Sequence, residues 1–334
     1  MLSSAPATTR SSGIRATAAT LVEGQDGTDT LQFNGANINE KIDITANGSR
    51  ARFTRDVANI TMDLNSVEHI NFTALGGADT ITVGDLTSDR RHAGRTRSQR
   101  DARHGNRRRL DRPRHGHRHR RQRPDQVTAS GSSVTVSGLA AQVAITGAEA
   151  TDVLTISAGN GNDTINAGTM PAGSMSLVID GGAGSDTIIG SHGADTLIGG
   201  TGSDTVTGGQ GNDFADLGDG NDTFVWNPGD GSDIVEGGAG TDTLVFNGAN
   251  IGERIDISAN GGRARLIRDI GSVTMDLNGV EHIQLNILGG ADTITVNDLT
   301  GTGVTQVAID LGATPGRSAV TLLADTVIVN GTAG

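Results

Sequence analysis

The sequence predicts an all-β fold, a parallel β-roll or β-solenoid built from nonapeptide repeats, with a disordered Arg-rich insert. Three observations lead to this prediction. The 334 residues include 50 glycines but only 6 phenylalanines, 1 tryptophan, no tyrosine and no cysteine. A nine-residue motif recurs in register, and short stretches of alternating apolar residues lie on either side of it. Because aromatic side chains supply much of an ordinary core, this composition favours a thin, repetitive core of Ile, Leu and Val.

The nine-residue motif has the form G-G-x-G-x-D-x-U-x, where U is a large apolar residue. Its copies begin at Gly181, Gly190, Gly199, Gly208 and Leu217 and, after a two-residue insertion, at Pro228 and Gly237. Their aspartates are Asp186, Asp195, Asp204, Asp213, Asp222, Asp233 and Asp242. An earlier outlier, AGNGNDTIN, supplies Asp163.

The motif has a direct physical interpretation as a turn followed by a short strand. Glycine allows positive φ and close backbone approach, so G-G-x-G-x-D makes a tight turn whose carbonyls can converge. The x-U-x segment suits a strand of about three residues with U facing inward. Two motifs close one coil of 18 residues, which stacks Asp186, Asp204 and Asp222 in one row and Asp195 and Asp213 in another. The expected inward residues are Ile188, Leu197, Val206, Phe214, Phe224, Ile234 and Leu244.

Stacked carboxylates at coil spacing repel one another, and a hard divalent cation with about six to eight oxygen ligands removes that repulsion. A β-solenoid without metal is the alternative, since Gly-, Asn- and Asp-rich turns also occur there. We favour calcium, because a metal-free solenoid would gain nothing from an aspartate at the sixth position of each motif. The predicted ligands are Asp186, Asp195, Asp204, Asp213, Asp222, Asp233, Asp242, Gly182, Gly184, Gly200, Gly202, Gly209 and Gly211.

These motifs resemble the RTX family, the haemolysin-type calcium-binding repeats. The resemblance implies that Ca²⁺ lies between successive turns on each edge and that a right-handed parallel β-roll folds when calcium binds. It also implies an extracellular, secreted protein with an uncleaved C-terminal signal of the type I secretion pathway. Met1–Leu21 lacks the apolar segment of a cleavable signal peptide.

A longer repeat flanks the nonapeptides. Residues 24–87 and 237–300 align without gaps at an offset of 213, with 45 of 64 positions identical. Alternating apolar residues predict short strands, including a hairpin between Ile255–Ser258 and Arg263–Ile267. The GGAD segment lacks the spacing of a full calcium turn, so Asp79 and Asp292 are weaker ligand candidates. We expect this module to continue the solenoid as a calcium-poor section.

Residues 88–124 hold 15 arginines and 3 acidic residues, whereas the whole chain has a net charge of −12. No aromatic residue interleaves this block, so we expect no nucleic-acid partner. When Phe224–Asp233 is written in G/C-rich codons and read from the second base, it gives the residues of Ser11–Thr20 in order. We infer that residues 1–21 and about 88–125 are out-of-frame readings of repeat DNA. On this interpretation the five histidines of the block are not metal ligands.

The predicted organisation has five segments. They are a disordered segment 1–21, a first β-solenoid module 22–87 (a partial copy), a disordered Arg/His-rich segment 88–125, a calcium-binding β-roll 126–245 and a second β-solenoid module 246–334. No apolar stretch approaches the length of a membrane span.

We expect no enzymatic activity. The chain lacks H-E-x-x-H, G-x-S-x-G and a phosphate-binding loop, and it has no cysteine nucleophile. His192 in GSHGAD is expected to be a solvated turn residue. The predicted function is calcium binding coupled to folding of a secreted repetitive structural or adhesive protein, whose cell-surface or matrix partner is unknown. The alternative is the C-terminal RTX tail of a larger secreted enzyme or toxin, with this chain a fragment of it.

Overall fold

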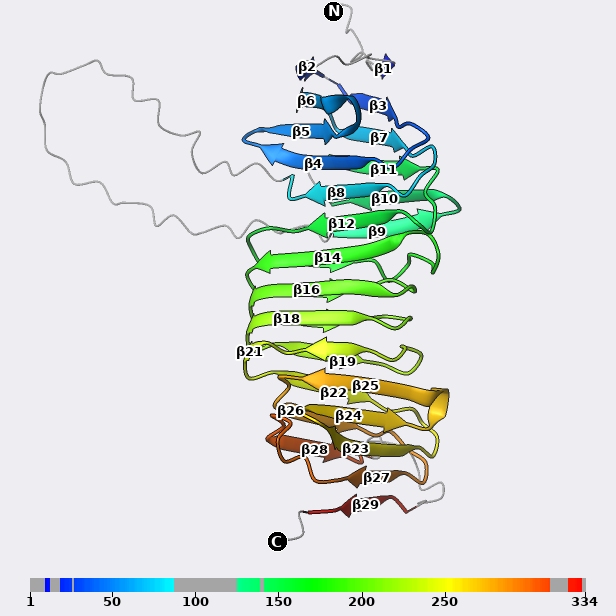
Figure 1. Cartoon of the computed structure of the whole chain (residues 1–334), viewed down its shortest axis with the longest axis vertical. Helices are drawn as coiled ribbons and strands as arrows, with labels where there is room; N and C mark the ends of the chain where they lie inside the picture. The colour runs from blue at the N-terminus through cyan, green and yellow to red at the C-terminus, as the bar shows by residue number, and fades with distance from the viewer. Residues whose placement is uncertain are drawn as a thin grey trace, which may run out of the picture.

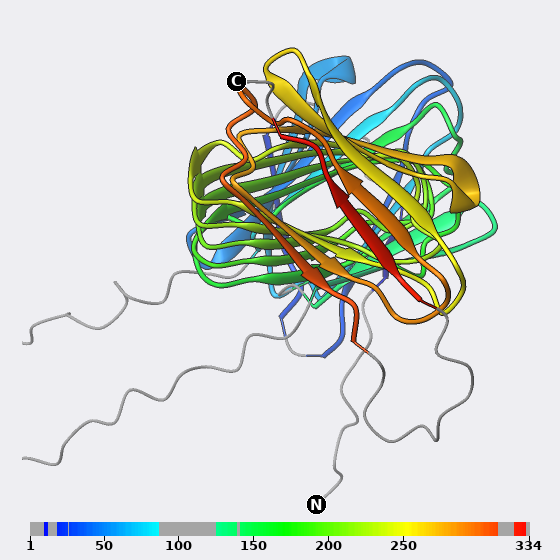
Figure 2. The same cartoon turned by 90° about the horizontal axis from the view of Figure 1, so that it is seen from below.

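The computed structural model describes residues 10–12, 19–25, 27–86, 125–138, 141–312 and 324–331. They form two sheets that face each other along the whole stack (Figures 1 and 2). The 13-stranded sheet contains β1 (Arg10–Ser12), β3 (Thr30–Asn34), β7 (His69–Thr73), β11 (Gln142–Thr146), β10 (Ser133–Ser137), β9 (Asp125–Ser130), β13 (Thr164–Asn166), β15 (Thr187–Ile189), β17 (Thr205–Thr207), β19 (Thr223–Trp226), β22 (Thr243–Asn247), β26 (His282–Asn286) and β28 (Gln306–Asp310).

The 16-stranded sheet lies on the other side of the core. It contains β2 (Ala19–Glu23), β6 (Ile60–Asn65), β5 (Arg50–Arg55), β4 (Lys41–Asn47), β8 (Thr80–Gly84), β12 (Val153–Ser157), β14 (Ser176–Ala183), β16 (Asp195–Gly202), β18 (Phe214–Gly220), β20 (Ile234–Glu236), β25 (Val273–Asn278), β24 (Arg263–Arg268), β23 (Arg254–Asn260), β27 (Thr293–Val296) and β29 (Thr326–Val329), with β21 (Ala239–Gly240) paired to β18. Two short 3-10 turns, Val57–Asn59 and Ile270–Ser272, join strands in the flanking modules.

The chain winds from one sheet to the other and back, and parallel strands of successive coils pair side by side. In the central section Thr187 pairs with Thr205, and Thr205 with Thr223. Both steps are 18 residues, which confirms the predicted coil of two nonapeptides. After the insertion the step becomes 20 residues, and Thr223 pairs with Thr243. The register therefore survives the insertion, because the extra residues are accommodated in a turn.

Three antiparallel meanders interrupt this parallel stacking. They are β4–β6 and β23–β25 in the 16-stranded sheet and β9–β11 in the other. The predicted hairpin is confirmed, with Asn260 opposite Arg263 and Gly261 at φ +67° in its turn. The strands of the β23–β25 meander follow one another in the sheet in the reverse of their order in the chain. β25 pairs with β20, and β23 pairs with β27 (Figure 1).

The core is a double row of inward side chains between the sheets. Ile188, Leu197, Val206, Phe224 and Leu244 are buried as predicted. The prediction is wrong for Phe214 and Ile234, which are 39% and 43% exposed. The inward positions there belong to Ala215 and Val235. Strand register decides this outcome, because alternate residues face opposite sides whatever their size.

The segments expected to be disordered lie largely outside the described residues. This holds for residues 1–9, 13–18 and 87–124, and therefore for the whole set of Arg-block histidines. Within 1–21, β1 pairs in parallel with β3, and β2 pairs in parallel with β6, which the sequence-based expectation did not include. At the other boundary, β9 begins at Asp125 and pairs with β13.

Candidate metal centre

The nonapeptide turns stack so closely that, in most copies, only glycine fits at the second and fourth positions of the motif. Gly200 and Gly202 have φ values of +108° and +131°. A Cβ atom on Gly202 would lie 1.7 Å from the carbonyl oxygen of Gly184, and one on Gly200 would lie 2.0 Å from that of Gly182. The same contact recurs at Gly209, against the carbonyl of Ser191, and at Gly211, against that of Gly193. Carbonyl oxygens of one coil are thus held directly beneath the backbone of the next.

The aspartates form two hydrogen-bonded ladders along the edges of the stack. On one edge, the backbone N–H of Asp186 donates to Oδ1 of Asp204, and that of Asp204 donates to Oδ1 of Asp222, each at 2.7 Å. The ladder continues from Asp222 to Asp242 at 2.8 Å. On the other edge, the N–H groups of Asp195 and Asp213 donate to Asp213 and Asp233 at 2.9 Å. The structure therefore brings the predicted aspartates into the two predicted rows.

These ladders overturn one argument made from sequence. A metal-free solenoid was expected to gain nothing from an aspartate in every turn. In the structure Oδ1 of every laddered aspartate except Asp195 accepts from a backbone N–H of the preceding coil, as in the bond from Asp186 to Asp204. A buried N–H without an acceptor costs about 1–3 kcal/mol. The aspartate is therefore part of the scaffold with or without a cation.

The second carboxylate oxygen has no such role. Each of these oxygens is buried and has no hydrogen-bond partner among the described residues: Oδ2 of Asp186, Asp204, Asp213, Asp222, Asp233 and Asp242. It points back into its own turn. Cβ atoms built on Gly181 and Gly199 would lie 2.7 and 2.8 Å from Oδ2 of Asp186 and Asp204. A buried, unpaired anionic oxygen beside turn carbonyls suits a hard cation such as Ca²⁺.

Burial within the rows disfavours the ionised form of these carboxylates. Burial, reinforced by the carboxylates of Asp233, Asp195 and Asp230, raises the pKa of Asp213 to about 8. Burial raises the pKa of Asp233 to about 7 and those of Asp186 and Asp242 to about 6. A bound cation opposes this effect, because it favours the ionised carboxylate.

Asp195 differs from the other predicted ligands. Its Oδ2 accepts from the backbone N–H of Ser191, and its Oδ1 accepts from the Ser191 hydroxyl at 2.9 Å. Serine stands there in place of the second glycine of the motif. Both oxygens of Asp195 are therefore occupied by protein groups. The neighbouring His192 is exposed, as expected for a solvated turn residue.

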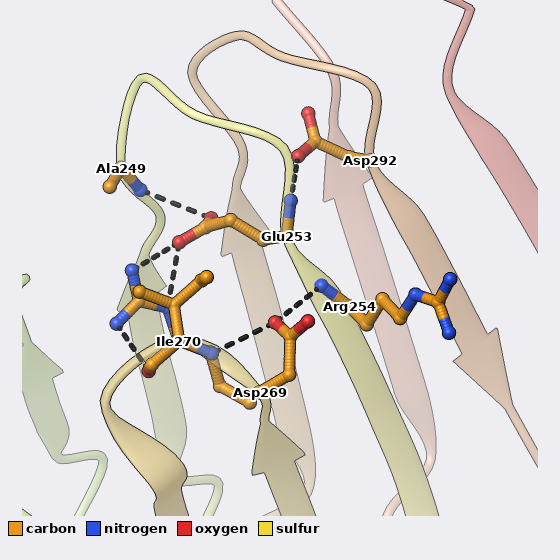
Figure 3. A network of polar contacts seen from close by, with 7 residues as sticks. Ala249, Glu253, Arg254, Asp269, Ile270 and Asp292 are labelled. Carbon is orange, nitrogen blue, oxygen red and sulfur yellow. Dashed lines mark hydrogen bonds and ion pairs between the residues drawn. The ribbon is translucent and has the colours of Figure 1, made fainter.

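Two turns of the flanking modules carry a cation of their own. Glu253 occupies the position of the motif aspartate, and its Oε2 accepts from the backbone N–H of Ala249 at 3.1 Å. Its Oε1 forms a buried ion pair with Arg268, whose Nε lies 2.7 Å away. Figure 3 shows the Glu253 carboxylate with its contact to Ala249. Arg268 also stacks over Trp226, with its guanidinium carbon 5.2 Å from the ring centroid. In the first module Glu40 and Arg55 form the equivalent ion pair.

Sequence reasoning missed or undervalued several buried acids of the same kind. Asp29, Asp79 and Asp292 are each at most 3% exposed and have carboxylate oxygens without partners among the described residues. Asp29 was not singled out, although the alignment at offset 213 places it opposite Asp242. That alignment was the signal that could have identified it. Asp79 and Asp292 were considered weaker candidates because their turns depart from the G-G-x-G-x-D spacing.

Among the described residues, no group of three or more His, Asp or Glu side chains is arranged to hold a metal ion. A cation in these turns would therefore depend on backbone carbonyls together with single carboxylates. The described part of the chain also contains no helix with the length and apolar character needed to cross a bilayer.

Comparison with known proteins agrees with this geometry. A family model described as RTX calcium-binding nonapeptide repeat matches in four copies, at residues 155–169, 178–206, 189–224 and 229–250. No curated protein matches the chain. RTX repeats are structural, bind calcium ions and occur typically in secreted proteins. The chain therefore carries, between residues 155 and 250, repeats of the RTX calcium-binding nonapeptide family.

Proposed function

We propose that the chain binds calcium in its stacked turns and that this binding completes the folding of a secreted structural or adhesive array. The observation that carries the proposal is the series of buried, unpartnered Oδ2 atoms on Asp186, Asp204, Asp213, Asp222, Asp233 and Asp242. Backbone carbonyls of the glycine turns supply the remaining oxygens. The turn glycines concerned are Gly182, Gly184, Gly200, Gly202, Gly209 and Gly211.

Calcium would contribute charge neutralisation in these turns. Without a cation, folding buries one unpaired carboxylate oxygen in each turn against others one coil away. Such burial opposes folding. A cation between coils removes this cost and binds the folded state but not the extended chain, so its binding free energy adds to the free energy of folding. Asp195 remains a predicted ligand, but the proposal does not depend on it.

The secreted, array-forming role is supported by two features. RTX proteins are typically secreted, and two modules with 45 of 64 identical residues flank the nonapeptides here. Each module continues both sheets of the roll, so neighbouring units can share one continuous core. A chain that folds only in calcium would stay extended in a calcium-poor cytosol and fold outside the cell.

Isothermal titration calorimetry of the full chain with CaCl₂ tests this proposal. Extracellular calcium modules bind with dissociation constants of about 10⁻⁴–10⁻³ M, and we expect saturation in that range with no heat from MgCl₂. Substitution of Asp204→Asn and Asp222→Asn should reduce the number of ions bound. No calcium binding at millimolar concentration contradicts calcium binding itself. Folding that is complete at submicromolar calcium contradicts the link to secretion.

A further inference from the structure

Asp79 lies outside the residues matched by the RTX family model, yet it repeats the arrangement of the RTX aspartates. Its Oδ1 accepts from the backbone N–H of Glu40 at 2.9 Å, and its own N–H donates to Oδ1 of Asp152 at 2.9 Å. The residue is 1% exposed. Oδ2 has no hydrogen-bond partner among the described residues. The carboxylate is thus anchored through one oxygen and leaves the other for a ligand.

The backbone of the preceding coil also lies close to this turn. Gly77 has φ +111°, and a Cβ atom on it would lie 2.8 Å from the carbonyl oxygen of Ile38 in the preceding coil. The carbonyl carbon of Ile38 and the backbone nitrogen of Asn39 would lie at 2.5 and 2.6 Å, so the whole peptide group faces Gly77, whereas the carbonyl oxygen of Gly184 is the nearest atom to Gly202. A Cβ atom on Gly76 would lie 2.3 Å from Oδ1 of Asn37. Neutral oxygens of the coil below are therefore packed against the backbone that leads to Asp79.

The charges around Asp79 do not balance. Its carboxylate is influenced by those of Asp152, Glu40 and Glu149, and in the described part of the chain it forms no ion pair with an arginine or lysine. Arg55, which pairs with Glu40, supplies one positive charge to the adjacent turn. The Glu40 turn thus contains its own cation, whereas no described arginine or lysine pairs with the Asp79 turn, one coil further.

The second module reproduces the arrangement independently. Oδ1 of Asp292 accepts from the N–H of Glu253 at 2.8 Å, and its Oδ2 is buried without a partner among the described residues (Figure 3). A Cβ atom on Gly290 would lie 2.3 Å from the backbone nitrogen of Gly252 and 2.6 Å from the carbonyl oxygen of Ile251, so a peptide group faces this turn as well. One on Gly289 would lie 2.7 Å from Oδ1 of Asn250. Both modules therefore combine an Arg-paired glutamate with an unpaired aspartate in the next coil.

We propose that the turns ending at Asp79 and Asp292 each bind a calcium ion, through Oδ2 and backbone oxygens, outside the RTX repeats. The flanking modules are then calcium-binding units in their own right. In each module the kind of cation then differs between two successive coils: the first turn contains an arginine guanidinium and the next binds Ca²⁺. Calcium suits the site because all the available ligands are oxygens, a donor set that favours hard cations.

The test is the number of calcium ions bound by the full chain, measured by equilibrium dialysis, in the double variant Asp79→Asn/Asp292→Asn. Asparagine retains an oxygen acceptor for the N–H groups of Glu40 and Glu253 and removes the anionic Oδ2. We expect the loss of one ion for each substituted turn. The matched control is Asp269→Asn, an exposed aspartate of the second module whose Oδ1 accepts from the N–H groups of Arg254 and Ile270. The control should bind as many ions as the unmodified chain.

An unchanged number of ions in the folded double variant overturns the inference and leaves the RTX sites intact. Absence of calcium from the unmodified chain overturns both this inference and the proposed function. If the double variant does not fold, crystals of the unmodified chain grown in calcium decide the question. Anomalous density beside Oδ2 of Asp79 and Asp292 supports the sites, and its absence there, with density in the RTX turns, rules them out.

Discussion

The backbone N–H of Asp204 donates a 2.7 Å hydrogen bond to Oδ1 of Asp222, one coil further along the stack. This contact divides the aspartate carboxylate between two roles. One oxygen joins consecutive coils, and the other, Oδ2, is buried without a partner among the described residues. The aspartate that recurs at this motif position thus has one oxygen for the scaffold and one for a cation.

Asp222→Asn and Asp222→Ala should separate these roles. Asparagine keeps an acceptor for the Asp204 N–H but removes the anionic oxygen, so calcium should be needed at higher concentration to fold the chain. Alanine also leaves the N–H unsatisfied, which costs about a further 1–3 kcal/mol. Calcium titrations followed by circular dichroism, with urea unfolding at saturating calcium, measure both effects. Equal unfolding free energies for the two variants would contradict the scaffold role of Oδ1.

Stability in calcium-free buffer should fall as pH rises. In the fold, burial raises the pKa of Asp213 to about 8 and those of Asp186 and Asp242 to about 6, above the value of about 3.9 in an unfolded chain. The folded chain therefore binds more protons than the unfolded chain between these values. The stabilisation is complete below pH about 4 and is lost as pH rises to about 8.

Urea unfolding of the calcium-depleted chain between pH 4 and pH 9 (about the limits of this window) measures this dependence. Asp213→Asn/Asp233→Asn is the matched variant, and its pH dependence should be weaker because two of the titrating groups are gone. A calcium-free chain that becomes more stable toward alkaline pH would show that the buried carboxylates do not titrate as described.

Arg268→Ala should destabilise the second module strongly, even in saturating calcium. The substitution leaves Glu253, which is 1% exposed, without its cation, and breaking a buried ion pair costs about 3–5 kcal/mol. Adding Glu253→Gln should restore part of the loss, because the buried charge is removed. Arg263→Ala is the control, since that arginine is half-buried and its partners Glu236 and Asp276 can be hydrated. Similar losses in unfolding free energy for Arg268→Ala and Arg263→Ala would contradict a larger contribution of the buried ion pair.

Gly202→Ala should prevent stacking of the roll, whereas Gly261→Ala should be tolerated. The new Cβ would lie 1.7 Å from the Gly184 carbonyl oxygen in the first case and has no atom within 4 Å in the second. Both glycines have positive φ, so the second substitution costs only about 1–2 kcal/mol of backbone strain. Calcium-dependent circular dichroism compares them. A normal calcium response in Gly202→Ala would mean that the coils are not packed this closely.

Much of the fold could be predicted because the period of the motif is tied to its geometry. Nine residues make a turn and a strand, so the stacking of Thr187, Thr205 and Thr223 follows from spacing alone. Phe214 and Ile234 were wrongly predicted as core residues because of their large apolar side chains. The strand register places Ala215 and Val235 in the interior instead. The order of the meander strands in the sheet was not predictable, because a three-stranded meander can pair with the preceding coil through either of its two outer strands.

The candidate site was predictable only in part. The spacing of the aspartates placed Asp204 and Asp222 in one row, but the bond between them joins residues 18 apart and leaves no local pattern in the sequence. Asp195 carries the right residue type in the right register, yet Ser191 satisfies both of its oxygens. The pairing of Glu253 with Arg268 follows from the β23–β24 hairpin, which places Arg268 opposite Ile255 and therefore beside the turn that ends at Glu253. The sequence predicted the hairpin but not this ion pair.

A calcium titration of the full chain followed by far-UV circular dichroism, with magnesium as control, tests the central claim most directly. The account predicts a cooperative gain of β signal with calcium and none with magnesium, because each buried Oδ2 requires a cation that fits an all-oxygen turn. A β signal already complete in chelator and unchanged by calcium would contradict it. The aspartate ladders would then be a scaffold that folds without metal.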